Sequence, residues 1–241
     1  MMYRVAIALV VAGCATDDPT SHWIANDGPP APVAGHAFVF GPNSANLSLE
    51  GATVSIAESP SITTTVAADG TFAFDVPSGG PTSFTLVQDG FHPNQSATIE
   101  VGSAGIAMLG FQSPAEEAFN TLANIVRVTP DPDRCQISTT VSRTGTEPFG
   151  GDGLGEAGAT AALDPPAGDG PIYFAYAGGT IYPDRSLVAT SLDGGVIFAN
   201  VPVGEYTLTA AKPGFTFSPV AIRCRAGVLV NAAPPNGLQE R

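Results

Sequence analysis

The stretch Asp193-Gly194-Gly195-Val196-Ile197-Phe198-Ala199-Asn200-Val201-Pro202-Val203-Gly204-Glu205-Tyr206-Thr207-Leu208 predicts a strand, a tight turn and a second strand. A weaker copy lies upstream in Asp69-Gly70-Thr71-Phe72-Ala73-Phe74-Asp75-Val76-Pro77-Ser78-Gly79-Gly80, followed by the apolar run Phe84-Thr85-Leu86-Val87. Each copy then reaches a Gly-Phe pair, Gly90-Phe91 and Gly214-Phe215. The chain therefore carries one β-unit twice.

The composition indicates an all-β protein with a substantial core. At 241 residues the chain is long enough for one or two domains, and 44% of its residues are hydrophobic. Charged residues make up 13% of the chain, about half the usual share of roughly 25%. Short apolar runs punctuated by Gly and Pro recur along the sequence, which is typical of all-β folds.

The charge balance is strongly acidic and excludes one class of partner. Nine Lys and Arg residues stand against 22 Asp and Glu residues, a formal net charge of -13. Nucleic-acid binding requires basic patches that neutralise phosphate, and this sequence supplies none. An acidic surface also disfavours anionic lipid head groups, so we interpret the charge as a solubilising surface.

The first 13 residues are typical of a bacterial export signal. A short segment with one positive charge, Arg4, precedes the apolar residues 5–12, which are too few to span a bilayer. The following Val11-Ala12-Gly13-Cys14 resembles the bacterial lipobox, which implies cleavage before Cys14 and lipidation of that residue. Ala15 in place of Asp favours the outer over the inner membrane of the cell envelope. An ordinary secretory signal with an incidental Cys remains the alternative.

Residues 14–32 are expected to form a lipidated, flexible tether. They are polar and rich in Pro, and such a segment buries too little apolar surface to fold. The chain has only two further cysteines, Cys135 and Cys224. Because an exported protein enters an oxidising compartment, we predict that these two residues form a disulfide.

Residues 33–112 are expected to form a first domain of about seven short strands. Asp69-Gly70 is a strong signal for a hairpin turn. Four motifs follow in the order Gly51-Ala52-Thr53-Val54, Asp69-Gly70-Thr71-Phe72, Val76-Pro77-Ser78-Gly79 and Gly90-Phe91. Their order resembles the carboxypeptidase regulatory-like, or transthyretin-like (prealbumin-like), family. That resemblance implies an Ig-like β-sandwich that is usually non-catalytic.

Residues 113–134 are expected to contain one helix and a linker between two such sandwiches. Ser113-Pro114-Ala115-Glu116 matches a capping box with Pro at the first helical position. Apolar residues at helical spacing predict a helix over residues 114–127, and Pro130 and Pro132 end it. Packing against a sandwich is the favoured role of its apolar stripe, and binding of a partner is the alternative.

Residues 135–235 are expected to form the second sandwich, and residues 236–241 a C-terminal tail. Between Gly158 and Asp193 this copy holds 17 more residues than the first copy does between Gly51 and Asp69. Copy two is also one residue longer before its Val-Pro motif, so the strand pairing is expected to differ locally. Tyr has an apolar face and a polar tip that suit glycan stacking and protein contacts. The candidate binding residues are the three tyrosines of the insertion, Tyr173, Tyr176 and Tyr182; coverage of the core is the alternative.

No residue pattern predicts catalysis or a cofactor. The three histidines, His22, His36 and His92, lack metal-ligand spacing, and the acidic loop residues lack EF-hand spacing, although calcium binding by them stays open. Gly153-Leu154-Gly155-Glu156-Ala157-Gly158 matches a dinucleotide-binding pattern but precedes a β-like segment instead of a helix. Lys212 is the only lysine and lies in a turn. We therefore expect no metal, no organic cofactor and no enzyme activity.

These observations predict an envelope lipoprotein with a structural or protein-binding role. The membrane would be contacted through the lipid on Cys14, and envelope proteins or glycans are the candidate partners. Two alternatives are a carbohydrate-binding surface lipoprotein and an accessory subunit of an envelope or secretion machine.

Overall fold

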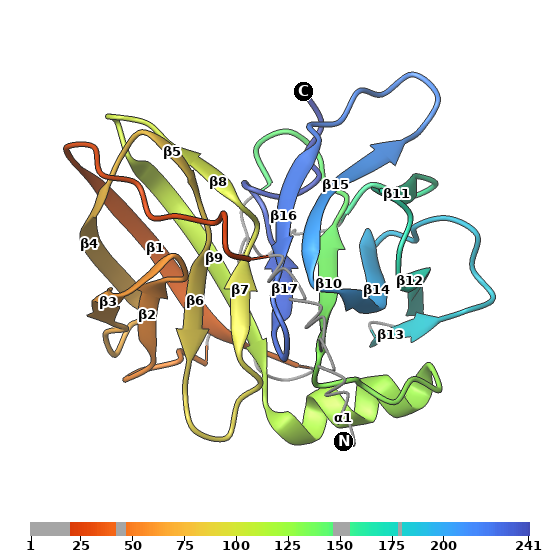
Figure 1. Cartoon of the computed structure of the whole chain (residues 1–241). Helices are drawn as coiled ribbons and strands as arrows, with labels where there is room; N and C mark the ends of the chain where they lie inside the picture. Colours follow the sequence, from red (N-terminus) through yellow and green to blue (C-terminus); the bar gives the residue numbers. More distant parts are fainter. Residues whose placement is uncertain (1–19, 42–46, 147–154, 178–179) are drawn as a thin grey trace, which may run out of the picture.

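The structure is a computed structural model that describes residues 20–41, 47–146, 155–177 and 180–241. The leader and Cys14 lie outside these ranges. Within these ranges the fold is all-β with one short helix, as the sequence predicts (Figure 1). Its strands belong to two β-sandwiches that share one continuous sheet.

The first sandwich consists of a three-stranded sheet facing four strands of a larger sheet. The three-stranded sheet has the order β4-β1-β9, and the four facing strands have the order β7-β6-β2-β3. Alternating apolar residues along these strands, such as Val33 in β1 and Phe84 and Leu86 in β6, meet between the layers. The strands are β1 (Pro30–Phe40), β2 (Thr53–Ile56), β3 (Ser59–Thr65), β4 (Thr71–Pro77), β6 (Phe84–Val87), β7 (Asn94–Ser96) and β9 (Ile106–Pro114), and β5 (Gly80–Thr82) pairs with β8 (Ile99–Val101) beside them.

The second sandwich repeats this topology. β14-β10-β17 corresponds to β4-β1-β9, with an antiparallel and a parallel partner on either side of the first strand in both copies. The facing sheet has the order β11-β15-β16, and the insertion adds β12 and β13 beside β14. The bounds are β10 (Arg134–Thr140), β11 (Thr160–Asp164), β12 (Asp169–Ala177), β13 (Thr180–Asp184), β14 (Gly195–Pro202), β15 (Gly204–Ala211), β16 (Val220–Cys224) and β17 (Leu229–Ala232).

The extra residue of the second copy forms a β-bulge. Along β10 and β14, Cys135 pairs with Val201 but Ile137 pairs with Phe198, so β14 holds one residue more than its partner. Asn200 takes it up with a φ of 52°, a left-handed conformation that Asn tolerates. Its backbone N–H donates to the Gln136 side chain at 2.9 Å. The first copy pairs β1 with β4 without such a shift, which confirms the expected difference.

A parallel pair of strands fuses the two sandwiches into one sheet of nine strands. Val230 of β17 lies opposite Gln95 of β7, and Gln95 donates to the carbonyl of Arg223 on one face of the sheet. On the other face, the Asn94 and Asn231 amides donate to the Gln112 carbonyl of β9 at 2.8 and 3.0 Å. Paired residues share a face, so the sheets β4-β1-β9 and β11-β15-β16 lie on opposite faces of the shared sheet (Figure 1).

The fused sheet revises the expected boundary between the domains. Ala97, which precedes β8, packs into the core of the second sandwich, and the Thr98 N–H donates to the Ala221 carbonyl of β16. Residues 236–241 also do not form the separate C-terminal tail that we expected, because Leu238 is fully buried in that core. The sandwiches are therefore joined edge to edge as well as through the helix segment.

The expected hairpin turn at Asp69-Gly70 connects two sheets, and the tight turn between the two predicted strands of the second copy does so as well. β3 and β4, on either side of Asp69-Gly70, belong to different sheets, and so do β14 and β15, on either side of Val203. Gly70 has a φ of 85°, and Asp69 accepts the Thr71 N–H at 2.9 Å, so the turn itself forms as its residues predict. Local turn chemistry does not determine which sheet the next strand joins, and the hairpin prediction for Asp69-Gly70 is wrong for that reason.

The helix α1 (Glu116–Ile125) is shorter than expected and lacks the capping box. Ser113 belongs to β9, where its hydroxyl is buried, and Ala115 is the N-cap residue. The Gly90 carbonyl accepts the Glu116 N–H at 3.0 Å instead, and His92 stacks on Phe119 at 3.6 Å between ring centroids. Tertiary contacts therefore replace the local cap.

The expected flexible tether ends earlier than residue 32. Pro30 begins β1, and the Gly28 N–H donates to the Ser78 carbonyl at 3.1 Å. Trp23 is buried, with 7% of its surface exposed. Residues 20–29, which we call the strap, begin at the junction of the two sandwiches and cross the first sandwich toward β4 (Figure 1). One large aromatic side chain buries enough apolar surface to hold a segment whose average composition is polar.

Candidate functional site

The insertion of the second copy forms a hairpin at one edge of the nine-stranded sheet. β12 pairs with β14 on its inner side, and β13 is the terminal strand. Tyr173 lies opposite Asp184, Ala175 opposite Tyr182, and Tyr176 opposite Ile181. The insertion therefore extends the sheet by two strands.

This register separates the three candidate tyrosines. Tyr173 is 3% exposed and joins the core, where its hydroxyl accepts the Ala161 N–H at 3.2 Å. Tyr176 and Tyr182 are 40% and 38% exposed. Because neighbouring residues of a strand point to opposite faces and Tyr176 pairs with Ile181, Tyr176 and Tyr182 lie on opposite faces of the hairpin. The structure does not bring the tyrosines together as one platform.

The surface around the hairpin is nevertheless rich in exposed apolar side chains. Five exposed apolar or aromatic side chains lie within residues 176–192: those of Tyr176, Ile181, Tyr182, Val188 and Leu192. Pro183 lies in the edge strand and has no N–H to donate, which discourages the addition of a further strand. Side-chain contacts, rather than strand pairing, are what this surface offers to a partner.

An ion pair holds the loop that follows β13. Both oxygens of Asp169 accept hydrogen bonds from the Arg185 guanidinium, at 2.9 and 2.5 Å. The hydrogen bond from Arg185 lowers the pKa of the Asp169 carboxyl. Arg185 also donates to the Val126 carbonyl just after α1, so it ties the insertion to the helix.

Cys135 and Cys224 form the predicted disulfide. Their Cα atoms are 5.7 Å apart, and both residues are fully buried. Cys135 lies in β10 and Cys224 in β16, so the bond crosses the core between the two sheets of the second sandwich. The prediction is confirmed.

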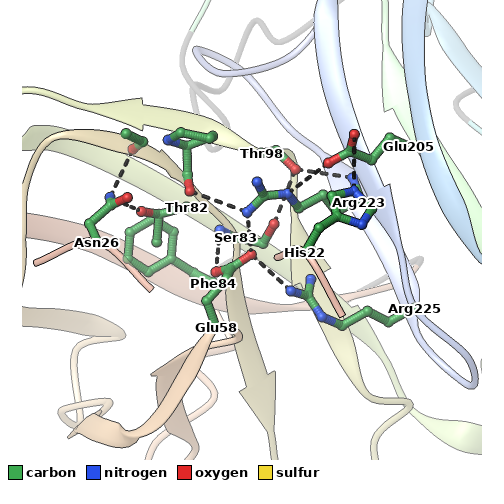
Figure 2. Close-up of polar contacts among 12 residues, drawn as sticks. His22, Asn26, Glu58, Thr82, Ser83, Phe84, Thr98, Glu205, Arg223 and Arg225 are labelled. Carbon is green, nitrogen blue, oxygen red and sulfur yellow. Dashed lines mark hydrogen bonds and ion pairs between the residues drawn. The ribbon is translucent and has the colours of Figure 1, made fainter. Parts of the chain in front are cut away.

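The residues on either side of Cys224 build a buried polar cluster between the sandwiches (Figure 2). Arg223 and Arg225 donate to the same oxygen of Glu58, at 2.9 and 2.8 Å. The other Glu58 oxygen accepts the Ser83 N–H at 3.0 Å, and only 1% of the Glu58 side chain is exposed. Arg225 also donates to Gln95 of β7 at 3.0 Å. One carboxylate of the first sandwich thus binds two cations of the second.

The strap covers this cluster. The Trp23 ring lies 4.8 Å from the Arg225 guanidinium and 5.8 Å from that of Arg223, which is cation–π geometry. Three residues further along the strap, the Asn26 amide donates to the Gly80 carbonyl and to the Thr82 hydroxyl, both at 2.9 Å (Figure 2). His22 lies 3.6 Å from Glu205. The strap therefore contacts both sandwiches.

Sequence reasoning missed Glu58, Arg223, Arg225 and Trp23. Two signals were available: the chain has one Trp, placed in a polar segment, and two of its nine cations flank a cysteine. Neither signal identifies Glu58, because its partners lie 165 and 167 residues away.

A second buried carboxylate lies at the far end of the second sandwich. Glu156, whose side chain is 4% exposed, accepts hydrogen bonds from Lys212 and, at 2.8 Å, from Arg143. The hydrogen bond from Lys212, followed by that from Arg143, lowers the pKa of the Glu156 carboxyl. Lys212 also lies over the Phe215 ring at 4.4 Å, at the rim of an open hollow of about 600 Å³. The only lysine is thus held in a structural ion pair.

Three of the six acidic loop residues, which are Asp131, Asp133, Asp152, Glu156, Asp164 and Asp169, form ion pairs within the protein. Asp169 and Glu156 are ion-paired as above, and Asp131 forms an ion pair with Arg134 at 3.2 Å. Asp152 lies outside the described residues. Across the described ranges, no three His, Cys, Asp or Glu side chains gather closely enough to hold a metal ion. Among those same residues, no helix has the length and apolar character to cross a membrane.

Comparison with known proteins finds similarity only among solved structures. No protein-family model and no curated protein matches the sequence. The minor pilin GBS52 of Streptococcus agalactiae is 10% identical, with a TM-score of 0.28, over 87% of this chain and 95% of that one. The shaft pilin SpaA of Lactobacillus rhamnosus GG, as a double mutant, is 10% identical, with a TM-score of 0.24, over 86% of this chain and 98% of that one.

The Bacillus anthracis TIE protein is also similar, at 12% identity and a TM-score of 0.27 over 88% of this chain. The chain spans about a third of that protein's length, 34%. At these identities and TM-scores, the similarity carries no conclusion about what this chain binds or does.

Proposed function

We propose that the chain is a non-catalytic, lipid-anchored module of the bacterial cell envelope that acts as a rigid structural and protein-binding element. The observation that carries the proposal is the nine-stranded sheet that fuses the two sandwiches. The two most buried carboxylates of the ion pairs described above, Glu58 and Glu156, each bind two cations of the same chain, which is a structural use of charge.

The anchor in this proposal is Cys14. It rests on the apolar leader, the lipobox-like Val11-Ala12-Gly13-Cys14 and the use of the other two cysteines in a disulfide, which leaves Cys14 as the one unpaired cysteine. Metabolic labelling with a fatty-acid analogue tests it, with Cys14→Ser as the matched control. We expect label in the parent chain and none in the variant. Label that persists in Cys14→Ser contradicts the anchor, and sucrose-gradient fractionation separates an outer-membrane from an inner-membrane location.

Within this proposal, the insertion is the surface that binds envelope proteins. Protein contact is favoured over glycan stacking because Tyr176 and Tyr182 lie on opposite faces of the hairpin and Tyr173 lies in the core. Capture from envelope extracts tests it, with Tyr176→Ala and Tyr182→Ala as variants. Loss of a specific partner in these variants, at unchanged melting temperature, supports the assignment. Binding on a glycan array that both variants abolish favours the carbohydrate alternative instead.

A further inference from the structure

The strap limits how far the two sandwiches, which we call the body, can lie from a lipid on Cys14. A free tether through residue 32 extends 18 residues beyond Cys14, which corresponds to at most about 60–65 Å of extended chain. The docked strap begins at Thr20, only six residues beyond Cys14, and six residues reach at most about 20–22 Å. Docking of the strap therefore removes about two thirds of the available reach.

The strap also determines where the segment between Cys14 and Thr20, which we call the leash, joins the body of the protein. Thr20 precedes Trp23 by three residues, and its carbonyl accepts the Trp23 N–H at 2.9 Å. Trp23 is held against Arg225 at the junction of the two sandwiches. The attachment point thus lies near the middle of the fused body and not at either of its ends (Figure 1).

We infer that the lipid-facing surface of this protein is the strap side of the junction, which we define by His22, Ile24 and Glu205, and that the body is held within about 20 Å of the bilayer. The inference rests on the proposed anchor at Cys14. All three residues are solvent-accessible, with Ile24 75% exposed and the side chains of His22 and Glu205 61% and 52% exposed. The occupant of this surface is the headgroup region of the anchoring membrane.

Proximity in this arrangement comes from the short leash and not from affinity for lipid. The two arginines nearest the strap are neutralised by Glu58 and Glu205, and the whole chain carries a net charge of -13. Such a surface supplies no excess of cations for anionic head groups. The unlipidated protein is therefore expected to stay off vesicles that the anchored protein covers.

The experiment installs the anchor chemically, so that it does not depend on lipidation in the cell. The chain from Cys14 onward, which retains every described residue, is coupled through its one free thiol to a maleimide lipid. The vesicles contain phosphatidylethanolamine and phosphatidylglycerol with a headgroup photocrosslinker. Mass spectrometry then maps which body residues the headgroups label. A failed metabolic-labelling test thus refutes the natural anchor, whereas this map tests the orientation.

We expect labelling around Glu205 and the end of β16 to exceed labelling of α1 and of the β12–β13 hairpin by several-fold. The matched control inserts a 12-residue Gly-Ser spacer before Thr20, which leaves the strap intact and should remove that preference. Neutron reflectometry on supported bilayers should show the protein layer of the spacer variant displaced outward by about 10 Å, from the coil dimensions of 18 against 6 residues. Equal labelling of α1 and the Glu205 region in the parent chain, or no displacement by the spacer, overturns the inference.

Discussion

Replacing Glu58 with Gln is the sharpest test of the junction between the sandwiches. The change keeps the size of a side chain that is 1% exposed but removes the charge that two arginines share. If the amide oxygen faces the arginines, two hydrogen bonds between charged partners become bonds to a neutral group, at a cost of about 1 kcal/mol each. The amide nitrogen then faces the buried Ser83 N–H, and that unpaired donor costs a further 1–3 kcal/mol or so.

We therefore expect Glu58→Gln to lower the free energy of unfolding by about 3–5 kcal/mol, the range typical of a buried ion pair that loses one partner. The matched control is Glu205→Gln, because Glu205 contacts the same Arg223 at 3.3 Å but is 52% exposed. That variant should lose less than about 1 kcal/mol. Both variants remove a negative charge that contacts Arg223, so the difference between their losses of stability reports the effect of burying the carboxylate.

The assay is urea unfolding followed by two signals. Circular dichroism reports on the whole fold, and fluorescence reports on the junction because Trp23 is the only tryptophan. We expect the two transitions to coincide in the parent chain and the Trp23 transition to come first in Glu58→Gln. A Glu58→Gln variant that loses no more stability than Glu205→Gln would refute the reasoning.

Three further predictions concern the second sandwich. Removing the disulfide with Cys135→Ala and Cys224→Ala should cost about 4–5 kcal/mol by chain entropy, because the bond closes a loop of 89 residues; equal urea midpoints with and without the bond would contradict this. The pKa of the Glu156 carboxyl is lowered in the folded state, so its contribution to the free energy of unfolding should be complete above about pH 5 and decline as the pH falls below about 4.3. In an acid titration, Glu156→Gln should therefore lose stability less steeply than the parent chain. Parallel curves would show that Glu156 plays no part. Tyr173→Ala should cost about 3–5 kcal/mol as a core truncation, and Tyr182→Ala less than about 1 kcal/mol, as read from thermal melts; similar losses would mean that the buried and exposed assignments are wrong.

The sequence alone determined the features that arise from neighbouring residues. The Asp-Gly turns, the alternation of apolar residues and the repeated order of motifs are local signals, and they predicted an all-β fold built from one repeated unit. The extra residue of the second copy predicted a local difference, which is the bulge at Asn200. The disulfide followed from counting cysteines, because only two remained to pair.

Only the tertiary structure decided how those pieces combine. The same turn can lead to a neighbour in the sheet or to the opposite layer, and burial of the strand's apolar face determines the outcome. Trp23 holds a polar segment against the body because Arg225 and Arg223, about 200 residues later, supply its partners. Tyr176 and Tyr182 are six residues apart, yet strand register places them on opposite faces. Each outcome depends on contacts between distant residues, and local sequence patterns carry no information about them.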